Sequence, residues 1–251
     1  CYFREESLLG NCFVTALLEC DQQRRSILKE PKYYRIFDYD KELLPNKHLA
    51  SLEIDVQTID EARRMTGATI GYPGWNLIYY ILLSHLDNNH EEIIIETGTN
   101  FGCTTIILAQ ALIDAKCNGK VISIEIDKDN VYRAKENIKL SKVQHMVEIC
   151  HGSSNKFLPE VVTKYKNIRF AFLDASHLYD DVLFEFETIL PSLADDALVL
   201  FDNTYQIADK GEDQRVYGAL GEIKRKYGGN FTSLEFVSWY TPGVVIWSKN
   251  K

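Results

Sequence analysis

From Glu91 onward, short apolar runs alternate with longer amphipathic stretches. Runs with few polar residues are typical of strands buried on both faces, and apolar residues that recur every three or four positions indicate helices. The expected strands are Ile93–Thr97, Val121–Ile126, Val147–Cys150, Ile168–Asp174 and Ala197–Asp202. The expected helices are Thr104–Lys116, Asp129–Leu140, Asn155–Tyr165 and Asp180–Leu190. This alternation predicts a parallel sheet with helices on both faces.

The last part of the chain departs from this alternation. A helix is expected over Glu212–Tyr227, followed by two strands over Phe231–Phe236 and Val244–Ser248. Because the turn before Val244 is short, these two strands are expected to be antiparallel neighbours. The sequence therefore predicts an α/β fold, with a Rossmann-like seven-stranded, mostly parallel sheet and a reversed C-terminal hairpin.

Residues 1–70 lack the strand pattern and are expected to form a helical N-terminal extension, with helices near Leu8–Leu18 and Thr58–Met65. No Ser/Gly-rich linker follows this stretch, so we expect it to pack on a catalytic domain at residues 71–251. It would serve as a lid or as an arm that joins two copies in a homodimer.

Composition narrows the classes of partner. The chain has 251 residues and a net charge of −8, which disfavours nucleic acid as a partner. Its six cysteines show no C-x-x-C spacing, so neither a zinc site nor a disulfide framework is indicated. No apolar run reaches the roughly 18 residues that a membrane helix needs. We therefore expect no membrane contact and a cytoplasmic location.

Two glycines follow the first expected strand, in the pattern Glu96-x-Gly98-x-x-x-Gly102. Open α/β sheets bind ligands at the carboxyl ends of their strands, and glycines there let the backbone approach a ligand. A dinucleotide site would need a third glycine, in the spacing G-x-G-x-x-G, to hold a pyrophosphate. The loop therefore favours a ligand without phosphate, although a plain strand-to-helix turn explains it as well.

Polar residues also follow the second and third strands. Glu125 is placed to accept hydrogen bonds from both hydroxyls of a ribose, with Ile126 beside it. Alternatively, Glu125 and Asp127 only stabilise the start of the next helix. After the third strand, Gly152, Ser153 and Ser154 would either meet an adenine edge or cap the following helix.

The fourth and fifth strands end in Asp174, with His177 close behind it, and in Asp202-Asn203. Two carboxylates and a carboxamide are hard oxygen ligands of the kind that Mg²⁺ accepts. A divalent cation there would lower the pKa of a substrate hydroxyl. His177 is either the general base for that hydroxyl or a surface or helix-capping residue.

Over about Glu91–Lys249, these landmarks resemble the metal-dependent O-methyltransferases, the group of the catechol and caffeoyl-CoA enzymes and, more distantly, the macrocin-type sugar enzymes. The resemblance implies that S-adenosylmethionine is the cofactor. It implies a methionine site near Glu96 and Thr104, a ribose site at Glu125 and an adenine site near Ser154, with the cation on Asp174, Asp202 and Asn203. The loop residues Gly98, Thr99, Asn100 and Gly102 would complete the cofactor site. Catechol enzymes have a lysine where this chain has His177, which leaves the base open.

The expected function is methyl transfer from S-adenosylmethionine to a hydroxyl of a small molecule, assisted by a divalent cation such as Mg²⁺. One alternative is a metal-independent methyltransferase with Asp174 or His177 as the base. A nicotinamide-dependent oxidoreductase and a non-catalytic protein that binds S-adenosylmethionine are further alternatives. The sequence does not select the acceptor, although several aromatic residues either line its pocket or belong to the core, among them Tyr72, Trp75, Tyr205, Trp239 and Tyr240.

Overall fold

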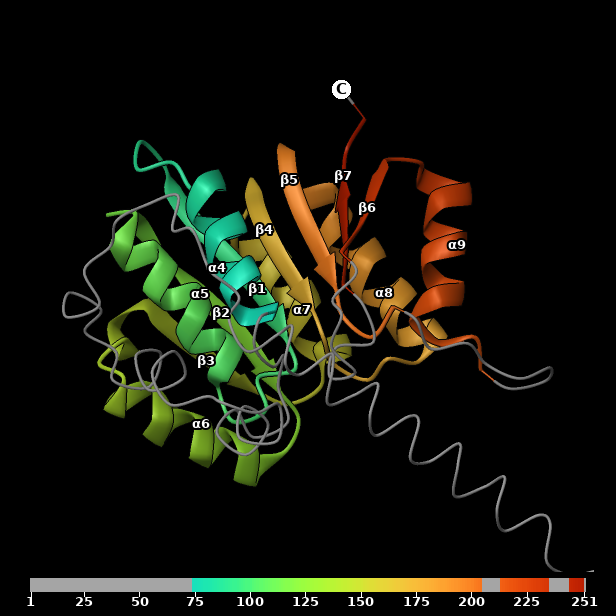
Figure 1. The fold of residues 1–251 in the computed structure, drawn as a ribbon. Coiled ribbons are helices and arrows are strands. Elements are labelled where there is room, and N and C mark those ends of the chain that lie inside the picture. Colours follow the sequence, from blue (N-terminus) through green and yellow to red (C-terminus); the bar gives the residue numbers. More distant parts are fainter. Residues whose placement is uncertain (1–73, 205–212, 235–243, 251) are drawn as a thin grey trace, which may run out of the picture. The chain divides into compact units, whose positions relative to one another are not determined.

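A seven-stranded sheet forms the centre of the computed structural model, which describes residues 74–204, 213–234 and 244–250 (Figure 1). The strand order is β3-β2-β1-β4-β5-β7-β6. All neighbouring pairs are parallel except those of β7, which is antiparallel to β5 and to β6. The strands are β1 (Glu91–Thr97), β2 (Asn118–Glu125), β3 (Val147–His151), β4 (Ile168–Leu173), β5 (Leu193–Phe201), β6 (Asn230–Leu234) and β7 (Val244–Ser248). The predicted fold, with its reversed final hairpin, is confirmed.

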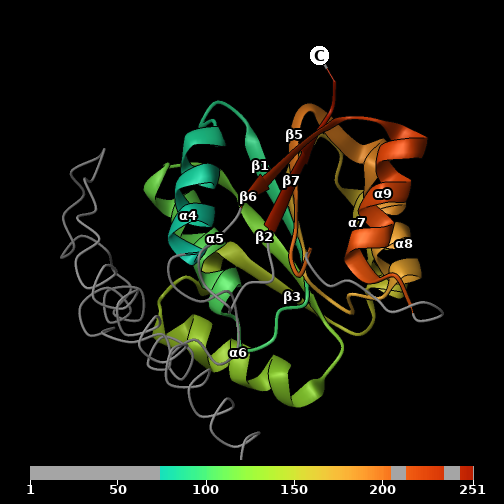
Figure 2. The same ribbon diagram turned by 45° about the vertical axis from the view of Figure 1, so that its right-hand side comes forward.

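Helices cover both faces of the sheet (Figure 2). Three of them pack on one face: α4 (Gly74–His85), α5 (Cys103–Asp114) and α6 (Lys128–Leu140). The other face carries α7 (Ser154–Lys164), α8 (Tyr179–Ile189) and α9 (Arg215–Tyr227). Short 3₁₀ turns stand at Gln144–Met146 and Leu190–Ser192. The alternation of side chains along each strand supplies both cores, since Ile94 packs with the first set and Ile93 and Ile95 pack with the second.

The predicted elements within these ranges are present, and most of their ends lie within three residues of the expected ones. Strand β5 begins at Leu193 rather than Ala197. Its first residues were missed because the exposed Asp195 and Asp196 interrupt the apolar pattern. Helix α4 was missed because it is apolar with little polar contrast between its faces. The expected extension at residues 1–70 and the connection before Val244 lie outside the described residues.

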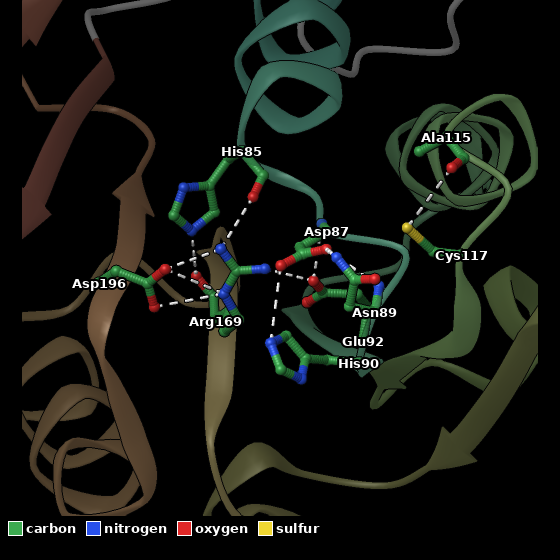
Figure 3. Close-up of polar contacts among 9 residues, drawn as sticks. All are labelled: His85, Asp87, Asn89, His90, Glu92, Ala115, Cys117, Arg169 and Asp196. Carbon is green, nitrogen blue, oxygen red and sulfur yellow. Dashed lines mark hydrogen bonds and ion pairs between the residues drawn. The ribbon is translucent and has the colours of Figure 1, made fainter.

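A half-buried arginine connects the amino ends of three strands to the end of α4 (Figure 3). The Arg169 guanidinium on β4 forms an ion pair with Glu92 of β1, whose side chain is 2% exposed. It also donates to Asp196 of β5, with Nη2 lying 2.7 Å from Oδ2, and to the carbonyl of His85 at 3.0 Å. These contacts raise the pKa of Arg169, chiefly through Asp196. The cluster lies at the amino ends of these strands, opposite the carboxyl edge of the sheet.

Arg169→Ala should lower the free energy of unfolding by about 3 kcal/mol, because it leaves the Glu92 carboxylate buried without a cation. Chemical denaturation at neutral pH measures this change. The matched control is Arg225→Ala, which removes an exposed ion pair with Glu222 and should leave stability nearly unchanged. Equal stability of the two variants would show that the buried cluster does not hold the sheet edge together.

Candidate functional site

A cavity of about 510 Å³ opens at the carboxyl edge of the sheet. Its walls come from the segments that follow β1, β2, β3, β4 and β5. Strand β1 lies between β2 and β4, so the chain turns to opposite sides of β1 at this edge. Such a reversal of strand order leaves a crevice in open α/β sheets. The cavity therefore lies at the strand ends, which is where the candidate residues were expected.

The loop after β1 brings the backbone close to the neighbouring strand end. Gly98 has a φ of +84°, and a Cβ atom there would lie 2.0 Å from the carbonyl oxygen of Asp174. Gly102, with a φ of +82°, immediately precedes α5 and packs against Ala134 of α6. Gly98, Asn100 and Thr104 line the cavity, whereas Gly102 does not. Only a residue without a side chain fits the first of these positions.

Glu96 and Thr99, which were expected to contact the cofactor, lie behind the cavity wall. The Glu96 side chain is fully buried and accepts hydrogen bonds of 2.5 Å from the hydroxyls of Thr105 and Ser123. Burial raises the pKa of Glu96 to about 7. The Thr99 hydroxyl lies 2.5 Å from that of Ser123. Neither Glu96 nor Thr99 lines the cavity, because side chains at these positions point into the core beneath α5.

Glu125 is held firmly at the end of β2. Its carboxylate accepts the backbone N–H groups of Asn100, at 2.7 Å, and of Asp127, at 2.8 Å. A carboxylate has about four acceptor positions, so capacity for two further donors remains on the cavity side. Asp127 caps α6 instead, accepting from the N–H groups of Asp129 and Asn130. The two alternatives from the sequence therefore apply to different residues, with Asp127 as the cap and Glu125 in the cavity wall.

The segment after β3 forms the next part of the wall, with Gly152, Ser153, Ser154 and Asn155. Ser153 stands at the N-cap position of α7, but its side chain makes no capping hydrogen bond. The side chain of Ser154 hydrogen-bonds to that of Glu185 on α8. The third strand end thus contributes hydroxyl groups to the cavity rather than a helix cap.

Four side chains meet at the ends of β4 and β5. His177 Nε2 lies 2.8 Å from Asp174 Oδ1 and 2.8 Å from Asn203 Nδ2, and Asn203 Nδ2 lies 3.2 Å from Asp202 Oδ2. His177 and Asn203 both have φ values of +58°, which non-glycine residues seldom adopt. The two loops thus converge through left-handed residues, a feature that is frequent at functional sites.

The electrostatics of this cluster favour neutral groups. Burial raises the pKa of Asp174 well above its usual range, and the nearby Glu96 adds to the effect. Burial and the adjacent Asp174 likewise raise the pKa of Asp202. Burial lowers the pKa of His177, so its imidazole is neutral at neutral pH. His177 Nε2 lies within hydrogen-bond distance of both Asp174 and Asn203, and the imidazole tautomer decides which of these two contacts it makes as donor or acceptor.

The donor set of Asp174, Asp202 and Asn203 fits a hard divalent cation in its chemistry. Asp202 Oδ1 is buried and has no hydrogen-bond partner. Two carboxyl groups and a carboxamide are oxygen donors of the type that Mg²⁺ binds, and a bound cation would favour the ionised form of both carboxyl groups. Within the described ranges, no three His, Cys, Asp or Glu side chains form a ready-made metal centre. The predicted site relies on the Asn203 amide as its third ligand.

The cavity also contains residues that the sequence did not single out: Asn130, Asn155, Ala175, Ser176 and Asp181. They follow the predicted strand ends by a few positions, and a wider window after each strand would have included them. The aromatic candidates for an acceptor pocket are Tyr72, Tyr205, Trp239 and Tyr240, together with the Trp75 side chain, and all lie outside the described residues. One cavity is therefore lined both by Glu125 and by Asp174.

Comparisons with known proteins agree with this geometry. Residues 95–204 match the sequence model of a methyltransferase domain family. Over 118 residues the chain is 30% identical to proteins named transmembrane O-methyltransferase from Propithecus coquereli and Homo sapiens. The match covers 45% of this chain and 42% and 40% of those proteins, so the chain spans less than half the length of these relatives. In the part of the chain that is described, no helix is both long enough and apolar enough to cross a membrane.

Solved structures share the fold. The O-methyltransferase TomG of Streptomyces achromogenes, in complex with S-adenosylmethionine, superposes with a TM-score of 0.68 at 18% identity, covering 91% of this chain and 99% of that one. The Bacillus cereus O-methyltransferase, in complex with S-adenosylhomocysteine, gives 0.63 at 20% identity and covers 82% and 98%. Residues 95–204 therefore resemble a methyltransferase domain, and the chain has the fold of these two solved O-methyltransferases.

Proposed function

We propose that the protein transfers the methyl group of S-adenosylmethionine to a hydroxyl of a small molecule. The observation that carries this proposal is the single cavity that joins Glu125 at one end to Asp174, His177, Asp202 and Asn203 at the other. Such a cavity can hold a nucleoside and an acceptor side by side, which is the arrangement that in-line displacement needs. The names of the relatives support O-methylation.

In the reaction, an acceptor oxygen attacks the methyl carbon while the bond from that carbon to sulfur breaks. The electron pair of the broken bond stays on sulfur, so the positive sulfonium becomes the neutral thioether of S-adenosylhomocysteine. The hydroxyl proton passes to the imidazole of His177 or to the ionised carboxylate of Asp174, which lie 2.8 Å apart. Glu125 would hold the ribose, and Gly98 would let the methionine part approach the backbone.

Asp174, Asp202 and Asn203 would hold a divalent cation such as Mg²⁺, which when bound lowers the pKa of an acceptor hydroxyl. The orphaned Asp202 Oδ1 and the crowding of two buried carboxyl groups support this part of the proposal. The metal-independent alternative keeps the same residues and makes His177 or Asp174 the sole base. The contact between His177 and Asp174 is the observation that supports this alternative.

Glu125→Ala should weaken the binding of S-adenosylmethionine by roughly 10- to 100-fold, because hydrogen bonds to a charged acceptor are lost. Isothermal titration calorimetry measures the dissociation constant. Glu136→Ala, an exposed glutamate on α6 that does not line the cavity, is the matched control and should bind as the unchanged protein does. If the unchanged protein binds neither S-adenosylmethionine nor S-adenosylhomocysteine, the proposed cofactor is wrong.

Asp202→Ala and Asn203→Ala should each abolish the effect of added Mg²⁺ on turnover. Paramagnetic resonance of Mn²⁺ provides a readout independent of activity, because either substitution should leave the added Mn²⁺ free in solution. Asp195→Ala changes an exposed carboxylate on β5, the strand that Asp202 follows, and this variant should bind Mn²⁺ normally. Full activity in EDTA would contradict the metal-assisted mechanism and would favour His177 or Asp174 acting alone.

A further inference from the structure

Glu185, in the middle of α8, is a buried carboxyl group that pairs with no lysine or arginine in the described part of the chain. Its residue is 2% exposed, close to the 1% of Glu92 at the opposite end of the sheet. Glu92 has the guanidinium of Arg169 beside it (Figure 3). Glu185 forms no ion pair with any lysine or arginine in residues 74–204, 213–234 and 244–250, and its Oε1 atom has no hydrogen-bond partner there. The two carboxyl groups are thus almost equally buried, but among the described residues only Glu92 has a guanidinium beside it.

The contacts of Glu185 compensate only part of its burial. The Thr97 hydroxyl donates to Glu185 Oε2 at 2.8 Å, and Ser154 provides a second hydrogen bond. Burial nevertheless raises the pKa of Glu185 to about 7. Its neighbours on the buried face of α8 are apolar, namely Val182, Phe186 and Ile189. An apolar residue would complete that face at lower cost, since replacing buried charged groups with apolar ones is often neutral or stabilising.

Glu185 lies directly behind the cavity wall. Ser154, one of its two partners, lines the cavity. Thr97, the other partner, is the last residue of β1 and accepts the backbone N–H of Asp174 on its carbonyl oxygen at 3.1 Å and on its hydroxyl at 3.3 Å. One carboxyl group therefore connects the ends of β1 and β4 with the start of α7. His177 and Asp181 also lie close enough to influence its charge.

Glu96 provides a counterpart on the other face of the sheet. Glu96 and Thr97 are consecutive on β1, so their side chains point to opposite faces. Glu96 is held by the hydroxyls of Thr105 and Ser123, as Glu185 is held by those of Thr97 and Ser154. The end of β1 is thus enclosed between two buried carboxyl groups. Negative charge at this point favours a cation in the cavity, because screening inside a protein is weaker than in water.

We propose that Glu185 is a positioning residue of the cofactor site, whose charge favours the sulfonium of S-adenosylmethionine over the neutral sulfur of S-adenosylhomocysteine. This inference rests on the proposed use of S-adenosylmethionine. It gives the site a means to bind the cofactor with its sulfonium charge and to release the product, which lacks that charge. The hydrogen bonds to Thr97 and Ser154 align the strand ends, and the carboxylate charge discriminates between the two ligands.

The test is the ratio of two dissociation constants, measured by calorimetry at about pH 8, where Glu185 is ionised. Glu185→Gln keeps the size of the side chain and an oxygen that can accept from Thr97, but removes the charge. It should weaken S-adenosylmethionine binding roughly tenfold, as expected for a charge that is only partly screened, and leave S-adenosylhomocysteine binding nearly unchanged. Glu187→Gln is the control on the same helix, because Glu187 pairs at the surface with Lys226.

Equal weakening of both ligands by Glu185→Gln would show a purely structural role and would overturn the inference, as would no change in either. Failure of the unchanged protein to bind either ligand would instead overturn the proposed function, and the inference with it. Circular dichroism establishes whether the variant folds. If it does not, Glu185→Asp provides the test, since it withdraws the charge by one methylene and should weaken S-adenosylmethionine more than S-adenosylhomocysteine.

Discussion

The parallel pairing of β1 with β2 and β4 is the constraint on which the rest of the site depends. Its register aligns Thr97 with Ile124 on one side and with Leu173 on the other. Three strands therefore end together, and the next residue along each of them, Gly98, Glu125 and Asp174, lines one cavity. The close approach of Gly98 to the Asp174 carbonyl belongs to the same alignment. If the register of any of these strands shifted by one residue, its side chains would point to the opposite face of the sheet.

The two ends of the sheet handle buried charge in different ways. At the amino end, Arg169 neutralises Glu92 and Asp196, so the cluster is electrically balanced within the chain. At the carboxyl end, Glu96, Glu185 and Asp202 are buried and Asp174 is half-buried. Among the described residues, their partners are hydroxyl, amide and imidazole groups rather than a guanidinium. Negative charge at that end would be neutralised by protons or by bound cations. This asymmetry separates an end that stabilises the fold from an end suited to ligands.

The strands were predictable because burial on both faces leaves a direct mark in the sequence, as in Ile93–Thr97. The strand ends were predictable for the same reason, since polar residues stand out immediately after an apolar run. The sequence could not reveal that Glu96 points into the core beneath α5, because the direction of a side chain depends on register. Glu185 was missed because it occupies a helix, although its spacing from Val182 and Ile189 places it on the apolar face. A charged residue at an apolar helical position was the available signal.

The raised pKa values link ligand binding to protons. Glu96 and Glu185 have pKa values of about 7 in the folded chain, above the values of about 4.5 that free carboxyl groups have. Between these values the folded chain binds more protons than the unfolded chain, so these two groups make the folded state less stable as pH rises from 4.5 to 7. A cation in the cavity favours the ionised carboxylates and reverses part of that loss. Binding of a cation there and deprotonation of Glu96 and Glu185 are therefore coupled, and each promotes the other.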